Sequence, residues 1–481
     1  MKKENIETYL SDASNYHGSA EAVYSPKNVF EIRGIIKKYS DKNISVTCQG
    51  ARTGLTGSGV PDSGVVISSE NLNKISFDEK TEKVICGPGV IHKDLDDFLI
   101  NYNRFLPPNP TETLSMIGGN VGTNASGSRT YKYGAMRNWV SALSVVLPSG
   151  EILRLNRNDN SQNSKERQIF LRSENNMEYL VDVSEIGMPN IKHAAGYFLK
   201  KDMHAIDLFI GSEGTLGFIY EIELETLPLP ESILGLLIFF DRKEGMLDFV
   251  ENLQSNKSLI KGGPRLIEYF GKNALDTLRG FYPQIPNKSV GAIWIEEELG
   301  EGEGEDEFNN LEQWMGLISK YSELSDETWT AQNEKEHRFF AEFRHKLPEE
   351  IYENLAGKNK QKIGTDCAVS RDKFRDYYHW LYKKLDEINM SYLVFGHIGN
   401  SHVHANLFYE NDEQMKKAKT FYQKLVTETL RLGGTVSAEH GIGKIKKEYL
   451  KQMFGEKNLE IMKNIKKTFD PKNIFGRGNM F

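Results

Sequence analysis

Residues 107–140 read PPNPTETLSMIGGNVGTNASGSRTYKYGAMRNWV, a stretch dense in Gly, Ser, Thr and Asn. So many small residues would weaken any buried helix or strand, because glycine loses the most conformational freedom on folding and has no side chain to pack. Such a composition suits backbone that comes close to another group. We therefore expect the main chain of this stretch to lie against a ligand.

Two more glycine-rich segments share this character. QGARTGLTGSGVP, from Gln49 to Pro61, directly follows a strand-like run, and GSEGTLG, from Gly211 to Gly217, precedes the strand-like FIYEIELETL. Glycines with positive φ can turn successive N–H groups toward one point, which makes a nest for a pyrophosphate. The spacing matches neither the Rossmann fingerprint nor a P-loop. The three segments together predict a large polyanionic ligand laid along backbone, as a dinucleotide would be.

Helical and strand periodicities are mixed through the first half of the chain. Apolar residues at helical spacing, and short β-branched runs bounded by Gly, Pro or Asn, mark these elements. The expected helices are Val29–Tyr39 and His92–Asn101, and the expected strands are Ile44–Cys48, Val65–Ile67 and Val84–Cys86. Leu143–Leu147 and Glu151–Leu155, joined by Pro148-Ser149-Gly150, predict a hairpin. The mixture favours an α+β fold over a regular βαβ winding.

The length of 481 residues predicts about two or three domains. Two prolines in Leu227-Pro228-Leu229-Pro230 end a strand-like run and stiffen a linker, so the boundary is expected there. The polar run Arg157–Gln168 predicts a surface excursion. The acidic run Glu296–Glu307 predicts a solvated loop, because consecutive acids repel and its glycines favour coil.

Composition excludes several classes of protein. The chain has 60 Lys+Arg and 67 Asp+Glu, a formal charge of -7 and no basic stripe, which disfavours nucleic-acid binding. Its 3 isolated cysteines exclude a disulfide framework and a cysteine-ligated iron–sulfur cluster, and a reducing cytoplasm fits best. The N-terminus lacks the apolar core of a secretory signal. The longest apolar run, Ile233–Phe240, is too short to span a membrane and predicts a buried strand.

Histidines gather in GHIGNSHVHAN, residues 396–406, which holds three of the 11 histidines, and SAEHGIG follows with Glu439-His440. Strand alternation would send His402, His404 and Asn406 to one face, and His397 lies one glycine-containing turn earlier. Imidazoles with one carboxylate suit a divalent zinc, manganese or iron ion that still admits a substrate. Packed or surface histidines are the alternative interpretation, which the density beside a Glu-His pair disfavours.

In their order along nearly the whole chain, these motifs resemble the FAD-binding oxidoreductases of the vanillyl-alcohol oxidase superfamily, in the subgroup of D-lactate, glycolate and D-2-hydroxyglutarate dehydrogenases. ARTGLTGSGVP is similar to the family's pyrophosphate loop, IGGNVGTNASGSRTYKYG to its flavin signature, and GHIGNSHVHAN and EHGIG to its active-site motifs. The resemblance implies a two-part FAD-binding domain of the PCMH type over residues 16–230. It also implies a substrate or cap domain with an antiparallel sheet and helices over 231–445, and a terminal segment, 446–481, that returns to the FAD domain.

The resemblance implies FAD held without a required covalent link. The residues that it assigns to the cofactor are Gln49, Gly50, Ala51, Arg52, Thr53, Gly54, Leu55, Thr56, Pro108, Gly118, Gly119, Asn120, Gly122, Thr123, Asn124, Ala125, Gly127, Tyr133, Gly134, Glu213, Gly214, Gly217 and Ile219. Arg52 stands where the family usually has glycine, so the phosphate contacts are expected to differ locally. The tail has Phe475-Gly476-Arg477-Gly478 where the family commonly has Asn-Pro-Gly.

The implied reaction is oxidation of a D-2-hydroxy acid to the 2-oxo acid by hydride transfer to flavin, assisted by a divalent metal. The implied roles are metal binding by His397, His404 and Glu439, proton abstraction by His440, carboxylate binding by Arg344 and Lys362, and substrate or ligand positioning by Asn406. His402 stands where the family usually has asparagine, and is expected to support a ligand, shape the pocket or compete for the ion. Tyr197 resembles a family aromatic, and a packed core tyrosine explains it equally well.

The expected partners are a small 2-hydroxy acid and an electron acceptor such as a quinone, a cytochrome or an electron-transfer flavoprotein. A homodimer and a peripheral membrane contact are compatible with the sequence. Three other functions compete with this interpretation. They are a flavin-containing transferase like alkyl-dihydroxyacetone-phosphate synthase, which carries a run of histidines where this chain has Ala438-Glu439-His440, a zinc hydrolase, and a non-catalytic flavin module.

Overall fold

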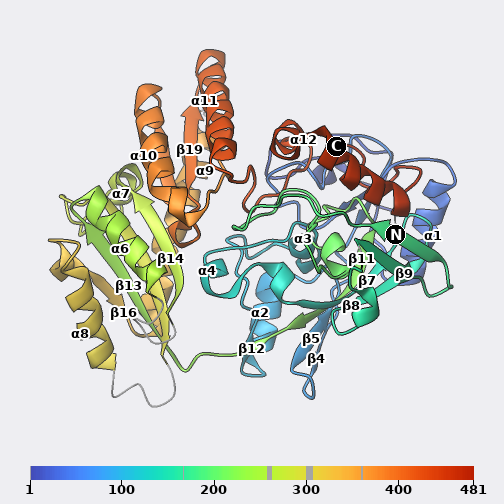
Figure 1. Cartoon of the computed structure of the whole chain (residues 1–481), viewed down its shortest axis with the longest axis horizontal. Coiled ribbons are helices and arrows are strands. Elements are labelled where there is room, and N and C mark those ends of the chain that lie inside the picture. Colours follow the sequence, from blue (N-terminus) through green and yellow to red (C-terminus); the bar gives the residue numbers. More distant parts are fainter. Residues whose placement is uncertain (1, 166, 257–262, 300–306, 359–360) are drawn as a thin grey trace. The chain divides into compact units, whose positions relative to one another are not determined.

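A computed structural model describes residues 2–165, 167–256, 263–299, 307–358 and 361–481, which form two compact units (Figure 1). The first unit comprises Met1–Gly127, Gly134–Leu229 and Ser437–Phe481, and the second comprises Ser128–Tyr133 and Pro230–Val436. Within the described ranges, no helix combines the length and the apolar character that crossing a membrane requires.

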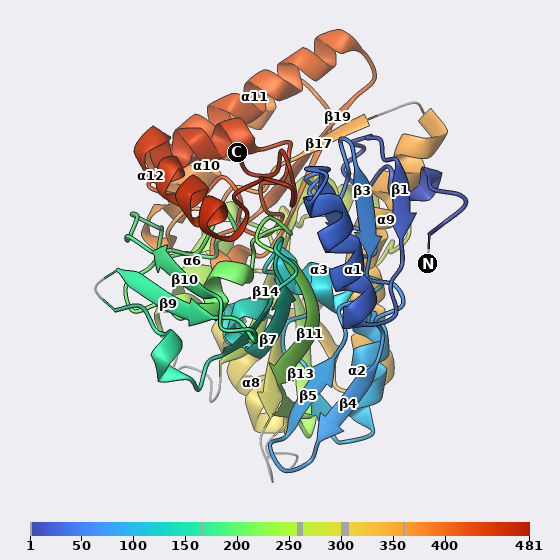
Figure 2. The ribbon, with the colours of Figure 1, turned by 90° about the vertical axis from the view of Figure 1, so that its right-hand side faces the viewer.

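The first unit begins with a small parallel sheet of order β1-β3-β2. Its strands are β1 (Ala22–Tyr24), β3 (Val65–Ser68) and β2 (Val46–Gln49), and α1 (Val29–Ser40) runs alongside them (Figure 2). Asn28 begins α1 by accepting a hydrogen bond from the backbone N–H of Glu31, and Ile32 and Ile36 on its inner face are fully buried. The predicted helix and the two predicted strands of this region are confirmed.

The larger sheet of the first unit is antiparallel, with the order β4-β5-β11-β7-β8. Its strands are β4 (Ile75–Asp78), β5 (Lys83–Cys86), β11 (Phe218–Glu225), β7 (Val140–Val146) and β8 (Ile152–Asn156). The predicted hairpin is confirmed as β7 and β8. Since β11 is the central strand, the segment GSEGTLG that leads into it is fixed at one end by the sheet.

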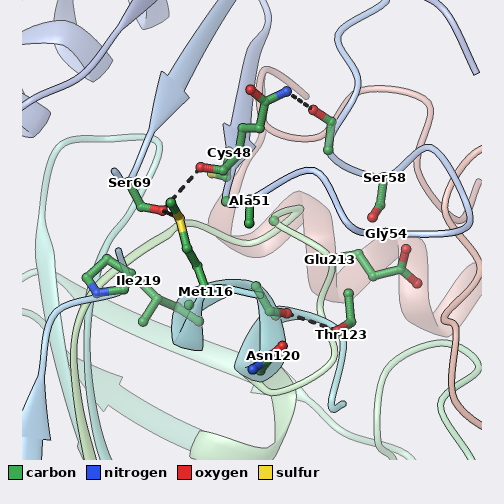
Figure 3. Close-up of a pocket in the computed structure, with 18 of the residues that line it drawn as sticks. Cys48, Ala51, Gly54, Ser58, Ser69, Met116, Asn120, Thr123, Glu213 and Ile219 are labelled. Carbon is green, nitrogen blue, oxygen red and sulfur yellow. Dashed lines mark hydrogen bonds between the residues drawn. The ribbon is translucent and has the colours of Figure 1, made fainter. Parts of the chain in front are cut away.

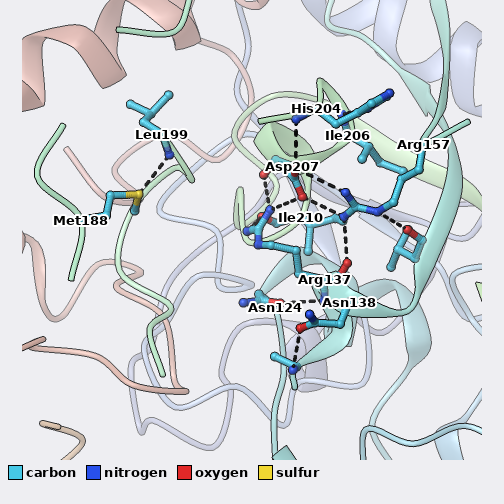
Figure 4. A network of polar contacts seen from close by, with 12 residues as sticks. Asn124, Arg137, Asn138, Arg157, Met188, Leu199, His204, Ile206, Asp207 and Ile210 are labelled. Atoms are coloured by element: carbon cyan, nitrogen blue, oxygen red, sulfur yellow. Dashed lines mark hydrogen bonds and ion pairs between the residues drawn. The ribbon is translucent and has the colours of Figure 1, made fainter. Parts of the chain in front are cut away.

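Smaller elements complete this unit. They are α2 (His92–Ile100), β6 (Arg104–Phe105), α3 (Ile117–Gly122), β9 (Gln168–Arg172), β10 (Glu178–Asp182), α5 (Ile206–Phe209), β12 (Leu227–Pro228), α12 (Lys447–Phe469) and the 3-10 turns Glu7–Tyr9, Met136–Asn138 and Asn160–Gln162. The polar run Arg157–Gln168 is not purely a surface excursion. Arg157 and Arg137 both bind the buried carboxylate of Asp207, at 2.7 and 3.2 Å (Figure 4). Burial alone would raise the pKa of Asp207, but the two guanidinium groups hold it below its usual value.

The second unit is built on a seven-stranded sheet of order β16-β13-β15-β14-β18-β19-β17, in which every neighbouring pair is antiparallel. Its strands are β16 (Trp329–Ala331), β13 (Ser232–Phe240), β15 (Gly291–Leu299), β14 (Pro264–Gly271), β18 (Tyr392–Gly396), β19 (His404–Tyr409) and β17 (Gln361–Gly364). The buried strand predicted at Ile233–Phe240 is confirmed as β13.

Helices cover both faces of this sheet. The helices of the second unit are α4 (Thr130–Tyr133), α6 (Lys243–Ser255), α7 (Lys272–Leu278), α8 (Glu307–Ile318), α9 (Glu334–Lys358), α10 (Arg371–Glu387), α11 (Asp412–Arg431) and the 3-10 turns Ser325–Glu327 and Ile398–Asn400. Phe343 and Leu347 of α9 pack with Phe270, Trp294 and Phe395 of the sheet, which defines the α9 face. The opposite face packs against α6 and α10.

The prediction of a solvated loop is wrong for the first residues of the acidic run, because Glu296–Leu299 belong to β15. Glu296 is buried with its Oε2 atom 2.8 Å from Arg265 Nε, and the buried Glu297 accepts a hydrogen bond from Trp314 Nε1 at 2.7 Å. Strand alternation sends these neighbouring acids to opposite faces, where each has its own partner, so they do not repel. Residues 300–306 lie outside the described residues.

The predicted α+β class, with a two-part first unit and a second unit of antiparallel sheet and helices, is confirmed. The domain limits 16–230, 231–445 and 446–481 stay predictions. The two compact units differ from them in that Ser128–Tyr133 belong to the second unit and the chain returns to the first unit at Ser437.

Candidate functional site

A pocket in the first unit is formed by all three glycine-rich segments (Figure 3). The predicted cofactor residues that line it are Gln49, Gly50, Ala51, Arg52, Thr53, Gly54, Gly118, Gly119, Asn120, Gly122, Thr123, Glu213, Gly214, Gly217 and Ile219. The strands β2 and β11 and the helix α3 therefore bring to one place segments that are far apart in sequence.

Eight predicted cofactor residues are not among those that line the pocket. They are Leu55, Thr56, Pro108, Asn124, Ala125, Gly127, Tyr133 and Gly134. Tyr133 belongs to the second unit, where its hydroxyl donates a hydrogen bond to Glu298. The lining residues that sequence reasoning missed are Asp12, Cys48, Ser58, Gly59, Ser69, Pro88, Ser115, Met116, Ser212 and Phe218. Most of them lie within or next to the three glycine-rich segments, whereas Asp12, Ser69 and Pro88 lie outside these segments.

The glycines of α3 divide into two kinds. A Cβ atom at Gly118 would lie 2.4 Å from the Cβ atom of Pro88, so this glycine permits close packing within the protein. A Cβ atom at Gly119 or Gly122 would meet no atom within 4 Å. These two residues are three apart and share one side of the helix. Their bare backbone therefore faces the open space of the pocket.

Polar atoms without partners also line the pocket. Asn120 Nδ2, Ser115 Oγ, Gln49 Oε1 and Asp12 Oδ2 are buried, and none of them has a hydrogen-bond partner among the described residues. Buried polar atoms of this kind are costly unless a ligand or water satisfies them. Together with the bare glycine backbone, they fit a large ligand rich in hydrogen-bonding groups, as FAD is.

Arg52 adopts a left-handed backbone conformation with a φ of 64°. This region favours glycine, which gives a physical reason for the glycine that the resemblance leads one to expect at this position. The Arg52 guanidinium lies 4.8 Å from the centre of the Tyr9 ring, a cation–π contact that offsets part of the backbone strain. Its side chain is thereby fixed at the pocket rim.

The segment Ser437–Lys446, which carries Glu439 and His440, is held in the first unit by Glu213. The Glu213 carboxylate accepts hydrogen bonds from the backbone N–H groups of Ile442 and Gly443 at 2.7 and 2.6 Å. Burial raises the pKa of Glu213 to about 7, although these two N–H groups oppose the shift. Glu213 also lines the pocket, so one side chain joins the predicted flavin site to the segment of the predicted base.

Glu439, a predicted metal ligand, has partners of its own in the first unit. Ser126 Oγ donates to its Oε1 atom at 3.1 Å, and the buried Lys192 forms an ion pair with the same oxygen. The carbonyl of His440 accepts a hydrogen bond from Thr56 Oγ1 at 3.3 Å. Lys192 was missed by sequence reasoning, because nothing local distinguishes it from the other lysines.

The second unit brings His397, His402 and His404 together. Each offers a ring nitrogen, and these atoms lie within 4.8 Å of one another, which is close enough for all three to reach one cation. His397 and His402 are buried. The Nδ1 atom of His404 lies 2.9 Å from the carbonyl oxygen of Thr365, and the Nε2 atom of His402 lies 3.3 Å from the buried carboxylate of Asp366.

The other predicted residues of the second unit lie on the α9 face. Residues opposite each other in a ladder share a face, and His404 and Asn406 of β19 pair with the core residues Phe395 and Leu393. Lys362 Nζ donates to Asn406 Oδ1 at 3.5 Å, and burial lowers the pKa of this lysine. The Asn406 amide is thus one of the groups that face the Lys362 ammonium.

Arg344 reaches the same face from α9. Its guanidinium lies 4.7 Å from the centre of the Phe395 ring, and its Nε atom lies 3.3 Å from Glu268 Oε2. The other oxygen of Glu268 lies 2.5 Å from His397 Nδ1. Sequence reasoning missed Glu268, although a lone acid in the largely apolar strand PRLIEYFG was a usable signal.

Tyr197 is fully buried in the first unit. Its hydroxyl lies 2.6 Å from Thr215 Oγ1, and its ring meets the ring of Phe481 edge to face. Burial raises the pKa of Tyr197, so its hydroxyl stays protonated. These contacts agree with the interpretation of Tyr197 as a packed core residue.

The α+β first unit, with its glycine-lined polar pocket, has the features of a domain that binds a dinucleotide. Residues 20–156 match the FAD binding domain, and residues 237–480 match the C-terminal domain of FAD linked oxidases. The chain belongs to the FAD-linked oxidases, in agreement with the resemblance to the vanillyl-alcohol oxidase superfamily. It is therefore an FAD-linked oxidoreductase.

Relatives match over almost the whole chain. A D-lactate dehydrogenase of Archaeoglobus fulgidus is 29% identical over 95% of this chain and 90% of its own length. The glycolate oxidase subunit GlcD of Bacillus subtilis is 27% identical over 98% and 92%. A D-2-hydroxyglutarate dehydrogenase of Stutzerimonas stutzeri is 26% identical over 99% and 95%. A solved alkyldihydroxyacetonephosphate synthase shares the fold, with a TM-score of 0.66 at 15% identity over 99% of this chain and 81% of that one.

Proposed function

We propose that this protein oxidises a D-2-hydroxy acid to the 2-oxo acid with FAD and a divalent metal ion, zinc, manganese or iron. The observation that carries the proposal is the set of imidazole and cationic side chains gathered in the second unit, since an ion and a carboxylate need these two kinds of group. The printed names of the relatives, which are dehydrogenases or oxidases of D-lactate, glycolate and D-2-hydroxyglutarate, support the substrate class.

The substrate carboxylate is proposed to bind to Arg344 and Lys362. Both are basic residues of the second unit with largely buried side chains, and the rigid fork of a guanidinium suits a planar carboxylate. The Asn406 amide, which accepts a hydrogen bond from Lys362, would hold that ammonium in place for the substrate. Two cationic side chains of this kind favour acids over uncharged alcohols of similar size.

The metal is proposed to bind to His397, His404 and Glu439. Two imidazoles and one carboxylate are a ligand set that suits a divalent ion with open positions for a substrate. A divalent ion there would supply a Lewis acid that lowers the pKa of the substrate hydroxyl.

His440 is proposed to accept the proton of the substrate hydroxyl. An imidazole is the side chain most often used to move a proton near neutral pH. The reaction balances when the hydroxyl proton goes to His440 and the hydrogen on C2 leaves with two electrons as a hydride, which forms the carbonyl. Bound FAD supplies the acceptor for that hydride. The protein then holds the product by the same carboxylate contacts.

The electrons are proposed to leave to a quinone, a cytochrome or an electron-transfer flavoprotein, in a cytoplasmic protein that is free or at a membrane surface. A panel of quinone analogues, cytochrome c and a flavoprotein acceptor, each mixed with the reduced enzyme, would identify the acceptor class. Fast reoxidation by one class and slow reoxidation by the others is the expected outcome.

The test of the proposed function is anaerobic titration of the purified protein with D- and L-2-hydroxy acids, with flavin absorbance as the readout. Bleaching by one or more D-acids and by none of the L-acids is expected. Removal of metal by a chelator should abolish the bleaching and leave FAD bound, and zinc or manganese should restore it. Protein that stays colourless after FAD addition would favour a zinc hydrolase, and coloured protein that no acid bleaches would favour a flavin module or a transferase.

A further inference from the structure

We propose that Glu268 is a positioning residue that joins a metal-binding imidazole, His397, to the carboxylate-binding Arg344. One carboxylate that holds both groups would set the distance between the ion and the substrate carboxylate. This inference rests on the proposed function, because it assigns to Glu268 a part in the geometry of that site. Glu268 itself touches neither substrate nor ion and acts through its two partners.

The contacts of Glu268 are short and buried. Its Oε1 atom lies 2.5 Å from His397 Nδ1, and its Oε2 atom lies 3.3 Å from Arg344 Nε. The side chains of Glu268, His397 and Arg344 are 1%, 3% and 9% exposed, so water screens neither contact strongly. A buried carboxylate is costly unless it is paired, and these two partners supply the pairing. The arrangement is therefore rigid.

The carboxylate also determines which nitrogen of His397 carries the proton. An ionised carboxylate only accepts, so Nδ1 of His397 carries the proton and the lone pair is on Nε2. His404 has the same arrangement, because its Nδ1 atom faces the carbonyl oxygen of Thr365 and that oxygen also only accepts. Both proposed ligands thus present Nε2. Acceptors behind metal-binding imidazoles commonly orient them and raise their basicity.

Arg344 is left with a free donor by the same contact. Its Nε atom is directed at Glu268, whereas its buried Nη1 atom has no hydrogen-bond partner among the residues that the structure describes. A buried guanidinium N–H without an acceptor is costly, and a bound carboxylate would satisfy it. Glu268 therefore orients Arg344 with a terminal nitrogen available to the substrate.

The strand register explains how Glu268 reaches both partners. Glu268 of β14 stands opposite Trp294 of β15, on the face that α9 covers, so its side chain points toward the helix that carries Arg344. His397 directly follows the last residue of β18, the strand that pairs with β14 on its other side. Glu268 thus lies between the helix that carries Arg344 and the end of the strand that leads to His397.

The test compares Glu268→Gln with Glu296→Gln. Glu296 is a matched control, because it is a buried acid on the adjacent strand β15 whose partners are Arg265 and, at 3.6 Å, His337, neither of which is a proposed ligand of the ion or the substrate. The full-length flavoprotein is loaded with Co²⁺, and metal affinity is measured by chelator competition with the Co²⁺ absorption spectrum as the readout. Glu268→Gln should weaken metal binding by about 10- to 100-fold and raise KM for the acid more than it lowers kcat. Glu296→Gln should change neither.

A second variant keeps the proposal testable if Glu268→Gln does not fold. Arg344→Met removes a residue that is no ligand, yet it should weaken Co²⁺ binding by about threefold or more, because Glu268 loses one of the two groups that orient it. Unchanged Co²⁺ affinity in Arg344→Met, or in a folded Glu268→Gln, would overturn the proposal. A wild-type protein that binds no metal and is bleached by no hydroxy acid would instead overturn the proposed function, so the two failures are distinct.

Discussion

The carboxylate of Glu213 accepts a hydrogen bond at 2.6 Å from the backbone N–H of Gly443, a residue 230 positions later in the chain. A Cβ atom at the neighbouring Gly441 would lie 2.9 Å from Glu213 Oε1, so the backbone here approaches the acid as closely as only glycine permits. The contact fixes the segment that carries Glu439 and His440 to a side chain of the proposed flavin pocket. Glu213 therefore connects the proposed flavin pocket to the segment of the proposed base, and both belong to the first unit.

The raised pKa of Glu213, about 7, predicts a pH-dependent stability. The folded protein keeps this proton up to about pH 7, whereas an unfolded glutamic acid loses it near pH 4.3, so the native state binds more protons between these values. The contribution to stability is thus full below about pH 4.3 and is lost as pH rises to about 7. The expected loss is about 1.4 kcal/mol per pH unit within that window.

The measurement is urea unfolding of the wild type and of Glu213→Gln between pH 4.5 and 8. The free energy of unfolding of the variant should depend less steeply on pH than that of the wild type below pH 7, and the two slopes should agree above it. Glu185→Gln, at an exposed acid of the same unit, is the control and should keep the wild-type slope. Equal slopes for wild type and Glu213→Gln would contradict the shifted pKa.

Substitutions at the neighbouring residues Gly118 and Gly119 are predicted to differ in effect, one on protein stability and the other on flavin binding. Gly119→Leu places a Cβ atom where no atom beyond its own helix lies within 4 Å, so its side chain should extend into the pocket and remove flavin without loss of apoprotein stability. Gly118→Ala drives a methyl group to 2.4 Å from Pro88 Cβ and should destabilise the protein by about 1–3 kcal/mol. Visible flavin absorbance and thermal unfolding of the apoprotein separate the two. Normal flavin content in Gly119→Leu would place FAD elsewhere.

Local composition was enough to predict the glycine-rich segments and most elements of the first unit. Glycines such as Gly119 and Gly122 indicate backbone that must carry no side chain. Hydrophobic periodicity predicts helices such as α1. Both signals are local in sequence, so they can be used without knowledge of the tertiary fold. The same holds for His402 and His404, which strand alternation places on one side.

Pairings between distant strands could not be predicted in this way. Glu268 meets His397 across 129 residues only because β14 and β18 are neighbours in the sheet. The acidic run misled for the same reason, since the pairing of β15 with β14 brings Arg265 beside Glu296. A run of acidic residues considered alone predicts mutual repulsion. Only the pairing of the strands shows that basic side chains lie beside these acids.

Replacement of Lys466, a buried lysine of α12, is predicted to lower the free energy of unfolding strongly. Its ammonium donates to Asp470 Oδ2 at 2.9 Å and to the carbonyls of Thr215 and Phe475 at 3.0 and 2.8 Å. Lys466→Met would leave the Asp470 carboxylate buried without its cation, at a cost of about 3–5 kcal/mol. Lys467→Met, at the exposed neighbour, should change the free energy of unfolding by about 0.5 kcal/mol or less. Similar unfolding midpoints for the two variants would contradict this role of Lys466.

His402 predicts the metal preference of the proposed site. Its Nε2 atom lies 3.3 Å from the Asp366 carboxylate, and one ring nitrogen of His402 lies within 4.8 Å of ring nitrogens of His397 and His404. A third imidazole favours zinc or iron over manganese, which prefers oxygen ligands. His402→Asn exchanges a nitrogen ligand for an amide oxygen and should lower the ratio of zinc to manganese affinity by about tenfold or more. The ratio is measured by chelator competition with each ion.

His337→Asn is the control, since His337 lies in the same unit but binds the carbonyl of Ile233, and it should leave the ratio unchanged. An unchanged ratio in His402→Asn would mean that His402 supports the pocket without reaching the ion.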